Sequence, residues 1–160
     1  MSQEAPHISL RSPSMADAAY ILERENDEEA MQVSNHQGGY TLSDIKTFIT
    51  AAHELARDGQ QRWMIQEQEL GVVGMIDLFD FDAGSSQAGV GIWLDVEHRK
   101  SGIGSQAMRL LCEVSSIKNH LQTIFAHIQD DNRASIAFFE RVGFQHTQTN
   151  ADILTYRFSI

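Results

Sequence analysis

The sequence predicts an α/β (α+β) fold, a mixed, mainly antiparallel sheet of about seven strands flanked by about four helices. Three observations predict it. Short apolar or alternating segments are joined by tight polar turns, as in hairpins. Longer segments with apolar residues at helical spacing lie between them. The chain has 160 residues, 42% of them hydrophobic, which is enough for one core, so we expect a single domain over 1–160.

The first forty residues are expected to form one strand, one helix and a loop. Residues 7–11 alternate between apolar and polar, which indicates a short strand. Apolar residues then recur at helical spacing from Ser14 to about Met31. The polar, glycine-containing stretch at 35–40 is expected to be a loop.

A second helix is expected after this loop. Thr41 and Asp44, three residues apart, resemble a capping box at its start. Gly59 is expected to end it. Its apolar stripe consists of Ile45, Phe48, Ile49, Ala52 and Leu55.

The rest of the chain alternates between predicted hairpins and helices. Three sequential strands are expected at 62–67, 70–82 and 87–94. A helix to about Asn119 follows, because one apolar stripe runs from Ile103 to Ile117. The last elements are a strand at 123–128, a short helix at 134–142 with Gly143 as its cap, and a hairpin of strands 144–148 and 153–160.

Charge and cysteine content argue against several classes of function. The formal net charge is −10, from 22 acidic and 12 basic residues, which argues against a nucleic-acid partner and is compatible with a cationic substrate. The single Cys112 permits neither an intrachain disulfide nor a thiolate cluster, so no metal is expected. No apolar run approaches the ~20 residues that span a bilayer, so no membrane partner is expected. The first residues lack signal-peptide features, which predicts a cytoplasmic protein.

The strongest local signal lies between a predicted strand and a predicted helix, where residues 99–104 read Arg-Lys-Ser-Gly-Ile-Gly. The first N–H groups of a helix have no internal partners, and the helix dipole adds partial positive charge there. This helix start can therefore bind a pyrophosphate, which the backbone at Gly102 and Gly104 can approach closely. The segment matches neither a P-loop nor the dinucleotide-binding fingerprint, and alone it fits a tight strand-to-helix turn equally well.

Two motifs together resemble the GNAT superfamily of acyl-CoA N-acyltransferases. The signature R/Q-x-x-G-x-G/A is matched by Arg99, Gly102 and Gly104. About thirty residues on, 132–144 resembles the second motif, N-x-x-[SA]-x-x-[FL]-[YF]-E-[KR]-x-G-F. Residues 70–144 are most similar to the branch that holds the spermidine N-acetyltransferases and the acetyltransferases of ribosomal-protein N-termini. The resemblance implies an enzyme that transfers an acetyl group from acetyl-CoA to a primary amine, here a small cationic amine or polyamine.

The resemblance also implies which residues hold acetyl-CoA. The backbone at the end of strand 87–94 would pair with the pantetheine arm and offer N–H donors to an oxyanion; its residues are Leu94, Asp95 and Val96. The loop that would hold the pyrophosphate consists of Arg99, Lys100, Ser101, Gly102, Ile103, Gly104 and Ser105. Asn132 and Ser135 would contact the pantetheine, and Phe138 and Phe139 would border the thioester. On their own terms, Asn132 fits a helix N-cap equally well and the phenylalanines fit a core.

Two residues are candidates for handling the proton of the amine. An alkylammonium has a pKa of about 10 and no lone pair, so the acceptor must lose a proton before it attacks. Asp77 stands where spermidine-acetylating relatives have an acidic residue, which suggests that it orients the amine or acts as a base through water. His127 is the second candidate base. The alternative for Asp77 is a solvated strand residue without a catalytic role, and the alternative for His127 is a structural histidine.

Three departures from the family pattern keep other functions open. Many relatives carry a tyrosine as proton donor to the thiolate where this chain has Phe139. Lys100 stands where glycine is usual, and Ser101 where a basic residue is usual. Phe139 makes a non-catalytic CoA-binding module the alternative outside the enzymes. Within the enzymes, the branch that the chain resembles leaves a protein N-terminal acetyltransferase of the ribosomal-protein type as the alternative. A homodimer is usual for the family that the chain resembles.

Overall fold

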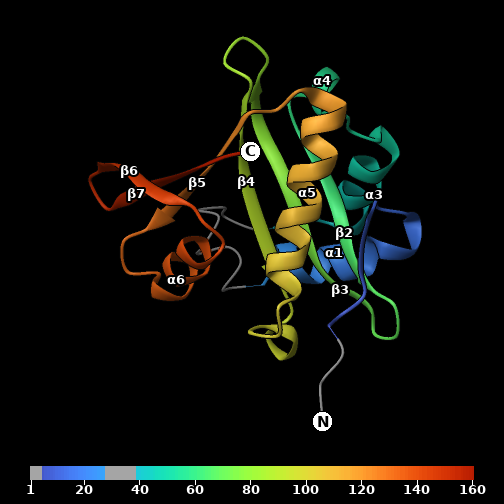
Figure 1. The fold of residues 1–160 in the computed structure, drawn as a ribbon. Helices are drawn as coiled ribbons and strands as arrows, with labels where there is room; N and C mark the ends of the chain where they lie inside the picture. The colour runs from blue at the N-terminus through green and yellow to red at the C-terminus, as the bar shows by residue number, and fades with distance from the viewer. Residues whose placement is uncertain (1–4, 28–38) are drawn as a thin grey trace.

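The computed structural model describes residues 5–27 and 39–160, which form a seven-stranded sheet with helices on both faces (Figure 1). The strand order is β1-β2-β3-β4-β5-β7-β6, and every neighbouring pair is antiparallel except β4 and β5. The predicted mixed, mainly antiparallel sheet is confirmed. The strands are β1 (Ile8–Arg11), β2 (Gln61–Glu67), β3 (Gly71–Asp82), β4 (Gln87–Leu94), β5 (Thr123–Gln129), β6 (Gln145–Asn150) and β7 (Ile153–Ser159).

The helices follow the predicted order. The capping box is confirmed, because Asp44 N donates to Thr41 Oγ1 at 3.1 Å and Thr41 N donates to Asp44 Oδ2 at 2.8 Å. The last part of the predicted first helix, after Asp27, and the loop predicted at 35–38 lie outside the described residues. The helices are η1 (Met15–Asp17), α1 (Ala18–Glu25), α3 (Leu42–Ala51), α4 (Leu55–Asp58), η2 (Val96–His98), α5 (Ile103–Asn119) and α6 (Arg133–Arg141).

The predicted second helix is in fact two helices, α3 and α4. Ala52 has a left-handed backbone (φ 48°) and ends α3, and α4 begins three residues later. The reason lies in packing on opposite faces of the sheet. Ile45 of α3 packs into a cluster with α1, whereas Leu55 of α4 packs into the cluster beneath α5. One straight helix cannot supply both clusters, so the chain turns at the edge of the sheet.

The two faces of the sheet therefore have separate cores. The larger core lies under α5 and α6 and includes Ile76, Leu78, Ala107, Leu111 and Phe139. The smaller core lies under α1 and α3 and consists of Ala18, Ile21, Ile45, Met64 and Met75. Among the described ranges, none of the helices has the length and apolar character that crossing a membrane requires.

Candidate active site

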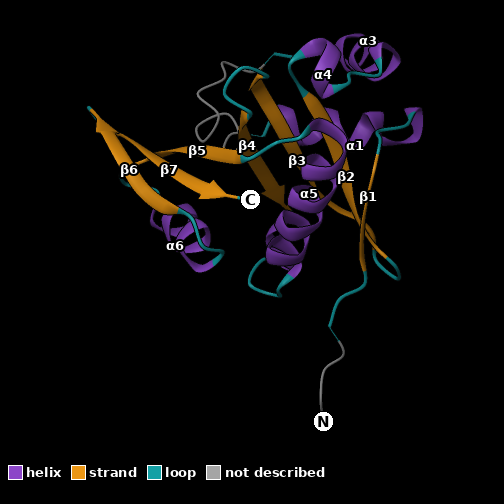
Figure 2. Cartoon of the chain, turned by 45° about the horizontal axis from the view of Figure 1, so that its top comes forward, coloured by secondary structure: helices purple, strands orange, loops and turns teal. Residues whose placement is uncertain are grey.

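The sheet opens between its two central parallel strands. β4 and β5 pair over three positions, the last being Gly89 with Phe125. Past this point β4 continues to Leu94 and β5 to Gln129, and no further pairing joins them among the described residues. β5 stays paired with β7 along its whole length. The unit β5-β7-β6 thus diverges from β4, as Figure 2 shows, and leaves a wedge between the two strands.

Beyond its last pair with β5, the backbone of β4 has one edge turned to this wedge. Asp95 N donates to Val73 O at 3.0 Å, so the backbone of Asp95 faces β3. Because successive backbone groups of a strand point to opposite sides, the N–H and C=O of Leu94 face away from β3, toward the wedge. The C=O accepts from Arg99 Nε at 2.9 Å, so the N–H is the group left for a ligand. An extended ligand arm can add to this edge as a further strand does. The N–H of Asp95, by contrast, is used within the sheet.

The helix start that follows is shaped as an anion site. Gly102 has φ 86° and precedes α5, whose first internal bond runs from Gln106 N to Gly102 O. The earlier N–H groups of this turn have no partner within the helix and carry the positive end of its dipole. They belong to Ile103, Gly104 and Ser105.

Side chains of the preceding loop fix its shape. Lys100 has φ 59°, a left-handed conformation that favours glycine, which explains why its position suits glycine. The Lys100 side chain is exposed, and Ser101 Oγ donates to His98 O at 2.6 Å. Arg99 Nε donates to Leu94 O at 2.9 Å, and its guanidinium lies 4.8 Å from the centre of the Trp93 ring. Arg99 therefore ties the loop to the open end of β4.

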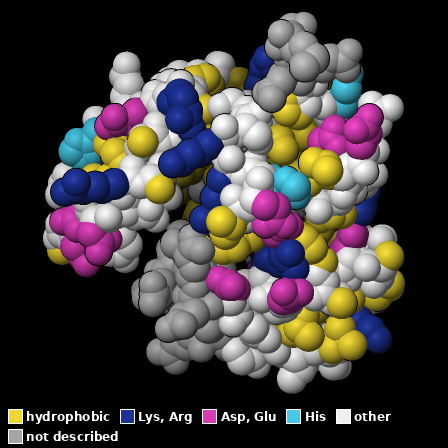
Figure 3. Space-filling view, turned by 90° about the horizontal axis from the view of Figure 1, so that it is seen from below, with side chains coloured by type: hydrophobic (Ala, Val, Ile, Leu, Met, Phe, Trp, Pro, Cys, Tyr) yellow, Lys and Arg dark blue, Asp and Glu magenta, His cyan; other side chains and the backbone are white. Residues whose placement is uncertain are grey.

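Gly104 brings three elements together. A Cβ on Gly104 would lie 2.8 Å from Phe138 Cε2 of α6 and 3.3 Å from Leu94 Cδ1 of β4. Glycine is therefore required by the close packing of α5, α6 and β4 as well as by any close approach of a phosphate. Figure 3, seen from the end where α5 begins, shows Lys and Arg side chains along a hollow on this side of the molecule.

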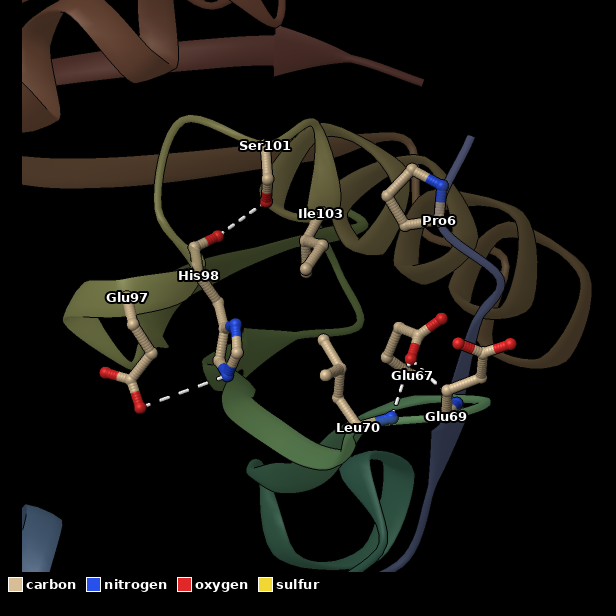
Figure 4. A pocket seen from close by; sticks show the side chains of 8 residues that line it. All are labelled: Pro6, Glu67, Glu69, Leu70, Glu97, His98, Ser101 and Ile103. Carbon is tan, nitrogen blue, oxygen red and sulfur yellow. Dashed lines mark hydrogen bonds and ion pairs between the residues drawn. The ribbon is translucent and has the colours of Figure 1, made fainter. Parts of the chain in front are cut away.

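An acidic cavity of about 290 Å³ lies beside the same loop (Figure 4). Glu67 accepts from Glu69 N at 2.7 Å and from Leu70 N at 2.8 Å, and the N–H groups of Leu70 and Glu69 hold the pKa of Glu67 below its ordinary value. The carboxylates that line the cavity would repel a pyrophosphate. The start of α5 is therefore the better place for that group. The lining residues are Pro6, Glu67, Glu69, Leu70, Glu97, His98, Ser101 and Ile103.

On the face covered by α1 and α3, one arginine binds two carboxylates. Arg62 of β2 makes a bidentate pair with Asp77 of β3, with both N–O distances 2.7 Å, and contacts Glu25 of α1 at 2.7 Å. The Arg62 side chain is 14% exposed. Burial lowers the pKa of Arg62, but the charges and hydrogen bonds of Asp77 and Glu25 raise it above its ordinary value. One guanidinium between two carboxylates leaves the cluster with one net negative charge.

Removing Arg62 is expected to destabilise the fold. Breaking a buried ion pair costs about 3–5 kcal/mol, and the partial exposure of the two carboxylates brings the expected loss for Arg62→Met to about 2 kcal/mol. The measurement is urea unfolding. The control is Arg57→Met, which removes a surface pair with Asp58 and should leave the unfolding midpoint nearly unchanged. Equal midpoints for wild type and Arg62→Met would show that the cluster does not stabilise the fold.

Aromatic side chains line the same face up to the wedge. Phe79 lies over Gly89, where a Cβ would come within 2.3 Å of its ring, and it meets Phe125 edge-on with ring centroids 6.3 Å apart. The Phe125 ring in turn lies 5.1 Å from the His127 ring. His127 is exposed, and its Nδ1 lies 3.0 Å from Thr155 Oγ1. The structure thus puts His127 at the wedge, two residues beyond the last β4–β5 pair.

Comparison with known proteins identifies the family. Residues 7–145, most of the chain, match the acetyltransferase (GNAT) domain. The chain belongs to the GNAT acetyltransferase family. It is accordingly an acyl-CoA-dependent N-acetyltransferase, and acetyl-CoA is the cosubstrate of such enzymes. The open edge of β4 and the free N–H groups at the start of α5 fit a pantetheine arm and a pyrophosphate.

Individual relatives of this GNAT acetyltransferase are distant in sequence. The uncharacterized N-acetyltransferase p20 of Bacillus licheniformis is 24% identical over 140 residues, 86% of this chain and 79% of that protein. The spermidine N-acetyltransferase of Vibrio cholerae, solved with CoA and spermine, has a TM-score of 0.83 at 15% identity over 95% of each chain. A dodecameric structure of the Vibrio cholerae enzyme has a TM-score of 0.75 at 14% identity, over 95% of this chain and 93% of that one. At these identities the solved structures show a shared fold.

Phe139 lies in the core of this acetyltransferase. Its side chain is 6% exposed and makes T-shaped contacts with Phe138 and Phe144, with ring centroids 5.2 and 4.9 Å apart. Phe138 is half-buried and packs against Gly104. The Phe139 ring, which has no hydroxyl, suits this position because its neighbours are other aromatic rings. Phe138 thus lies nearer the edge of β4, and Phe139 deeper between α6 and the sheet.

Asn132 is the N-cap of α6. Its side-chain oxygen accepts from Ser135 N at 3.2 Å. Ser135 lies in the first turn of this helix and is partly buried. Both residues therefore stand at the start of α6, and the side-chain carbonyl of Asn132 is engaged in capping.

The side chain of Asp95 fastens α1 across the end of β4. It is 8% exposed and accepts from Tyr20 Oη at 3.1 Å and Arg24 Nε at 3.0 Å. Burial, together with the Asp95 charge, raises the pKa of Tyr20, so its hydroxyl stays protonated. Ligand atoms of Asp95, Glu97 and His98 lie within 4.8 Å of one another, a spacing that a metal ion could use, but Asp95 Oδ1 is already bound by Arg24.

Sequence reasoning missed Arg62 and Glu25. A signal for Arg62 was present, because the two hairpin strands place Arg62 directly opposite Asp77 and opposite charges across a pair attract. Glu25 had no comparable signal. Its contact with Arg62 joins residues far apart in the sequence, and only the packing of α1 on the sheet brings it about.

Proposed function

We propose that this acetyltransferase acts on a small cationic amine of the polyamine class, which binds on the face of the sheet under α1 and α3. The observation that carries the proposal is the Glu25–Arg62–Asp77 cluster, which keeps one net negative charge beside the wedge. A second ammonium group of the acceptor would be attracted there. The net charge of −10 would add a long-range contribution to the rate of association.

The register of the sheet supports this placement. Asp77 pairs with Gly91 of β4, and Gly91 is two residues beyond the last β4–β5 pair. His127 is likewise two residues beyond it on β5. Gly91 has no side chain, and the nearest atom to a Cβ there would be Phe79 Cε1 at 3.9 Å. Room for an acceptor is therefore expected over Gly91, with Asp77 on one side and His127 on the other.

The two candidate residues would then have different roles. Both oxygens of Asp77 are engaged by Arg62, so Asp77 orients a distant ammonium rather than removing a proton. His127 would accept the proton of the attacking nitrogen. As the N–C bond forms, the carbonyl oxygen takes up the displaced electron pair and is stabilised by the N–H of Leu94. Collapse breaks the C–S bond, the sulfur keeps that electron pair, and protonation of the thiolate balances the reaction.

The binding of acetyl-CoA is proposed along the wedge and the start of α5, within one domain over 1–160. Leu94 would pair with the pantetheine, while Asp95 and Arg99 would hold the end of β4 in place. The phosphate contacts would come from the first turn of α5 and from Lys100. The other proposed neighbours of the ligand are Val96, Ser101, Gly102, Asn132, Ser135, Phe138 and Phe139. For the Vibrio cholerae enzyme of the same fold, a complex with CoA and spermine is known, which supports the proposed acceptor class.

The proposal is tested by thiol release from acetyl-CoA with spermidine, a monoamine and an N-terminal peptide as acceptors. A carboxylate near a second ammonium contributes about 1 kcal/mol when exposed, so Asp77→Asn should lower kcat/KM for spermidine about fivefold more than for the monoamine. The difference should shrink at high salt, because added ions screen the attraction.

Asp80→Asn provides the matched control. Asp80 lies on the same strand, is exposed, and has φ 49°, which asparagine tolerates well. The Asp80→Asn substitution removes one negative charge, as Asp77→Asn does, but leaves the contact between Arg62 and Asp77 in place. It should change kcat/KM for all three acceptors equally. A wild-type preference for the peptide would overturn the polyamine assignment and favour a protein N-terminal acetyltransferase. Equal losses on all acceptors with Asp77→Asn would show that Asp77 does not recognise the second ammonium.

A further inference from the structure

The imidazole of His127 is held in one orientation by two neighbours on its own face of the sheet. Its Nδ1 lies 3.0 Å from Thr155 Oγ1, and the Phe125 ring contacts its face with centroids 5.1 Å apart and planes at 52°. The side chain is exposed, so Nε2, at the opposite end of the ring, is open to a ligand in the wedge.

Thr155 is a rigid point for such a contact. It lies on β7 directly opposite His127 and is also paired with Gln148 of β6, so its backbone is fixed on both sides. Thr147 Oγ1 donates to Thr155 O at 3.3 Å. The residue is 7% exposed, and a β-branched side chain in a strand has few rotamers. The hydroxyl oxygen therefore stays at one place relative to the His127 ring.

We propose that Thr155 is a positioning residue for catalysis: its hydroxyl accepts the Nδ1–H of His127 and so keeps the lone pair on Nε2. A neutral imidazole carries one ring proton, and the bond made by one nitrogen decides which nitrogen bears it. With the proton on Nδ1, Nε2 accepts a proton from the attacking amine as the N–C bond forms. The imidazolium then has both nitrogens protonated and loses the extra proton after the thiolate has left. This inference rests on the proposed role of His127 as the base.

A second histidine in the same sheet has the reverse arrangement. His146 on β6 uses Nε2, which lies 2.8 Å from Thr149 Oγ1 and 3.0 Å from Gln148 O. Both His146 and Thr149 are exposed on the edge strand. The His146–Thr149 contact is therefore a control for the His127–Thr155 contact. It joins the same two residue types but lies in the hairpin of β6 and β7, outside the wedge.

The kinetic test compares Thr155→Val, Thr155→Ser and the control Thr149→Val. Thr155→Val keeps the shape and removes the hydroxyl, and loss of one hydrogen bond worth about 1 kcal/mol should lower kcat about fivefold without changing the KM for acetyl-CoA. Thr155→Ser should restore kcat to near the wild-type value, and Thr149→Val should leave it unchanged. If Thr155→Val keeps wild-type kcat, or serine does not rescue it, Thr155 does not position the base.

The second readout does not depend on turnover. In protein with ¹⁵N-labelled histidine at about pH 8.5, the ring nitrogen shifts distinguish the two neutral tautomers and the imidazolium. The expected result is Nδ1–H for His127 in the wild type and a shift toward Nε2–H in Thr155→Val. An Nε2–H tautomer in the wild type would overturn the proposal. The expected tautomer in a protein that acetylates none of the amines would instead support the positioning and overturn the acceptor class.

Discussion

Replacing Gly104 by glutamate is expected to weaken the binding of CoA strongly. The substitution puts a carboxylate at the N–H groups of the first turn of α5, where a pyrophosphate would bind. Two charges about 4 Å apart near a protein surface interact by about 1–4 kcal/mol, which corresponds to roughly a fivefold to several-hundredfold loss of affinity. The side chain would also displace Phe138, since its Cβ alone would lie 2.8 Å from that ring.

Calorimetry with Gly104→Glu and Gly104→Gln separates these two causes. The glutamine variant has nearly the same size without the charge, so its loss of affinity measures the displacement of Phe138 and the blocked approach. The glutamate variant should bind CoA at least about fivefold more weakly than the glutamine variant at low salt, for the electrostatic reason given. Thermal unfolding of both variants establishes that they are folded. Undiminished affinity in a folded Gly104→Glu protein would place the pyrophosphate elsewhere.

The second large effect is expected at His127. General base catalysis contributes typically about 10²–10⁴-fold, so His127→Gln should lower kcat by that order at saturating acetyl-CoA. The affinity for CoA should not change, because the contacts proposed for CoA lie at the end of β4 and the start of α5. The loss should be similar for spermidine and the monoamine, since each must lose a proton from its attacking nitrogen.

His146→Gln is the matched control for this variant. It makes the same substitution at an exposed histidine of the adjacent hairpin and should leave kcat near the wild-type value. A comparison with Asp77→Asn assigns the two roles: a fall in kcat on every acceptor at His127, against a selective loss on the diamine or polyamine at Asp77. If His127→Gln retains wild-type kcat while Asp77→Asn loses it on all acceptors, the carboxylate is the base despite its contact with Arg62.

Phe139 bears on how the thiolate leaves. Its buried ring has no proton to give, and a thiol with a pKa of about 8.5 is already a fair leaving group. The structure places no tyrosine at this point of α6, and Tyr156, whose hydroxyl donates to Glu140 at 2.8 Å, is buried on β7. The departing sulfur is therefore expected to take its proton from water or from the His127 imidazolium.

The sequence by itself determined the order of the strands and the position of the glycine-containing loop before α5. These features depend on neighbours along the chain. The capping box joins Thr41 and Asp44, which are three residues apart. The left-handed conformation at position 102 is one that glycine adopts readily. The motif residues from Arg99 to Gly104 are contiguous, so they reach the start of α5 whatever the rest of the fold does.

The tertiary structure alone decided which candidate residues meet. The break at Ala52 follows from two cores on opposite faces of the sheet, and no local pattern encodes a change of face. Asp77 looked like a free carboxylate, yet Arg62 occupies both of its oxygens. The wedge arises because β5 stays paired with β7 along its whole length but leaves β4 after three pairs. The same β5–β7 pairing places Thr155 opposite His127. The two side-chain contacts join residues 15 and 28 positions apart, and packing on a shared sheet face selects them, whereas local sequence preferences do not.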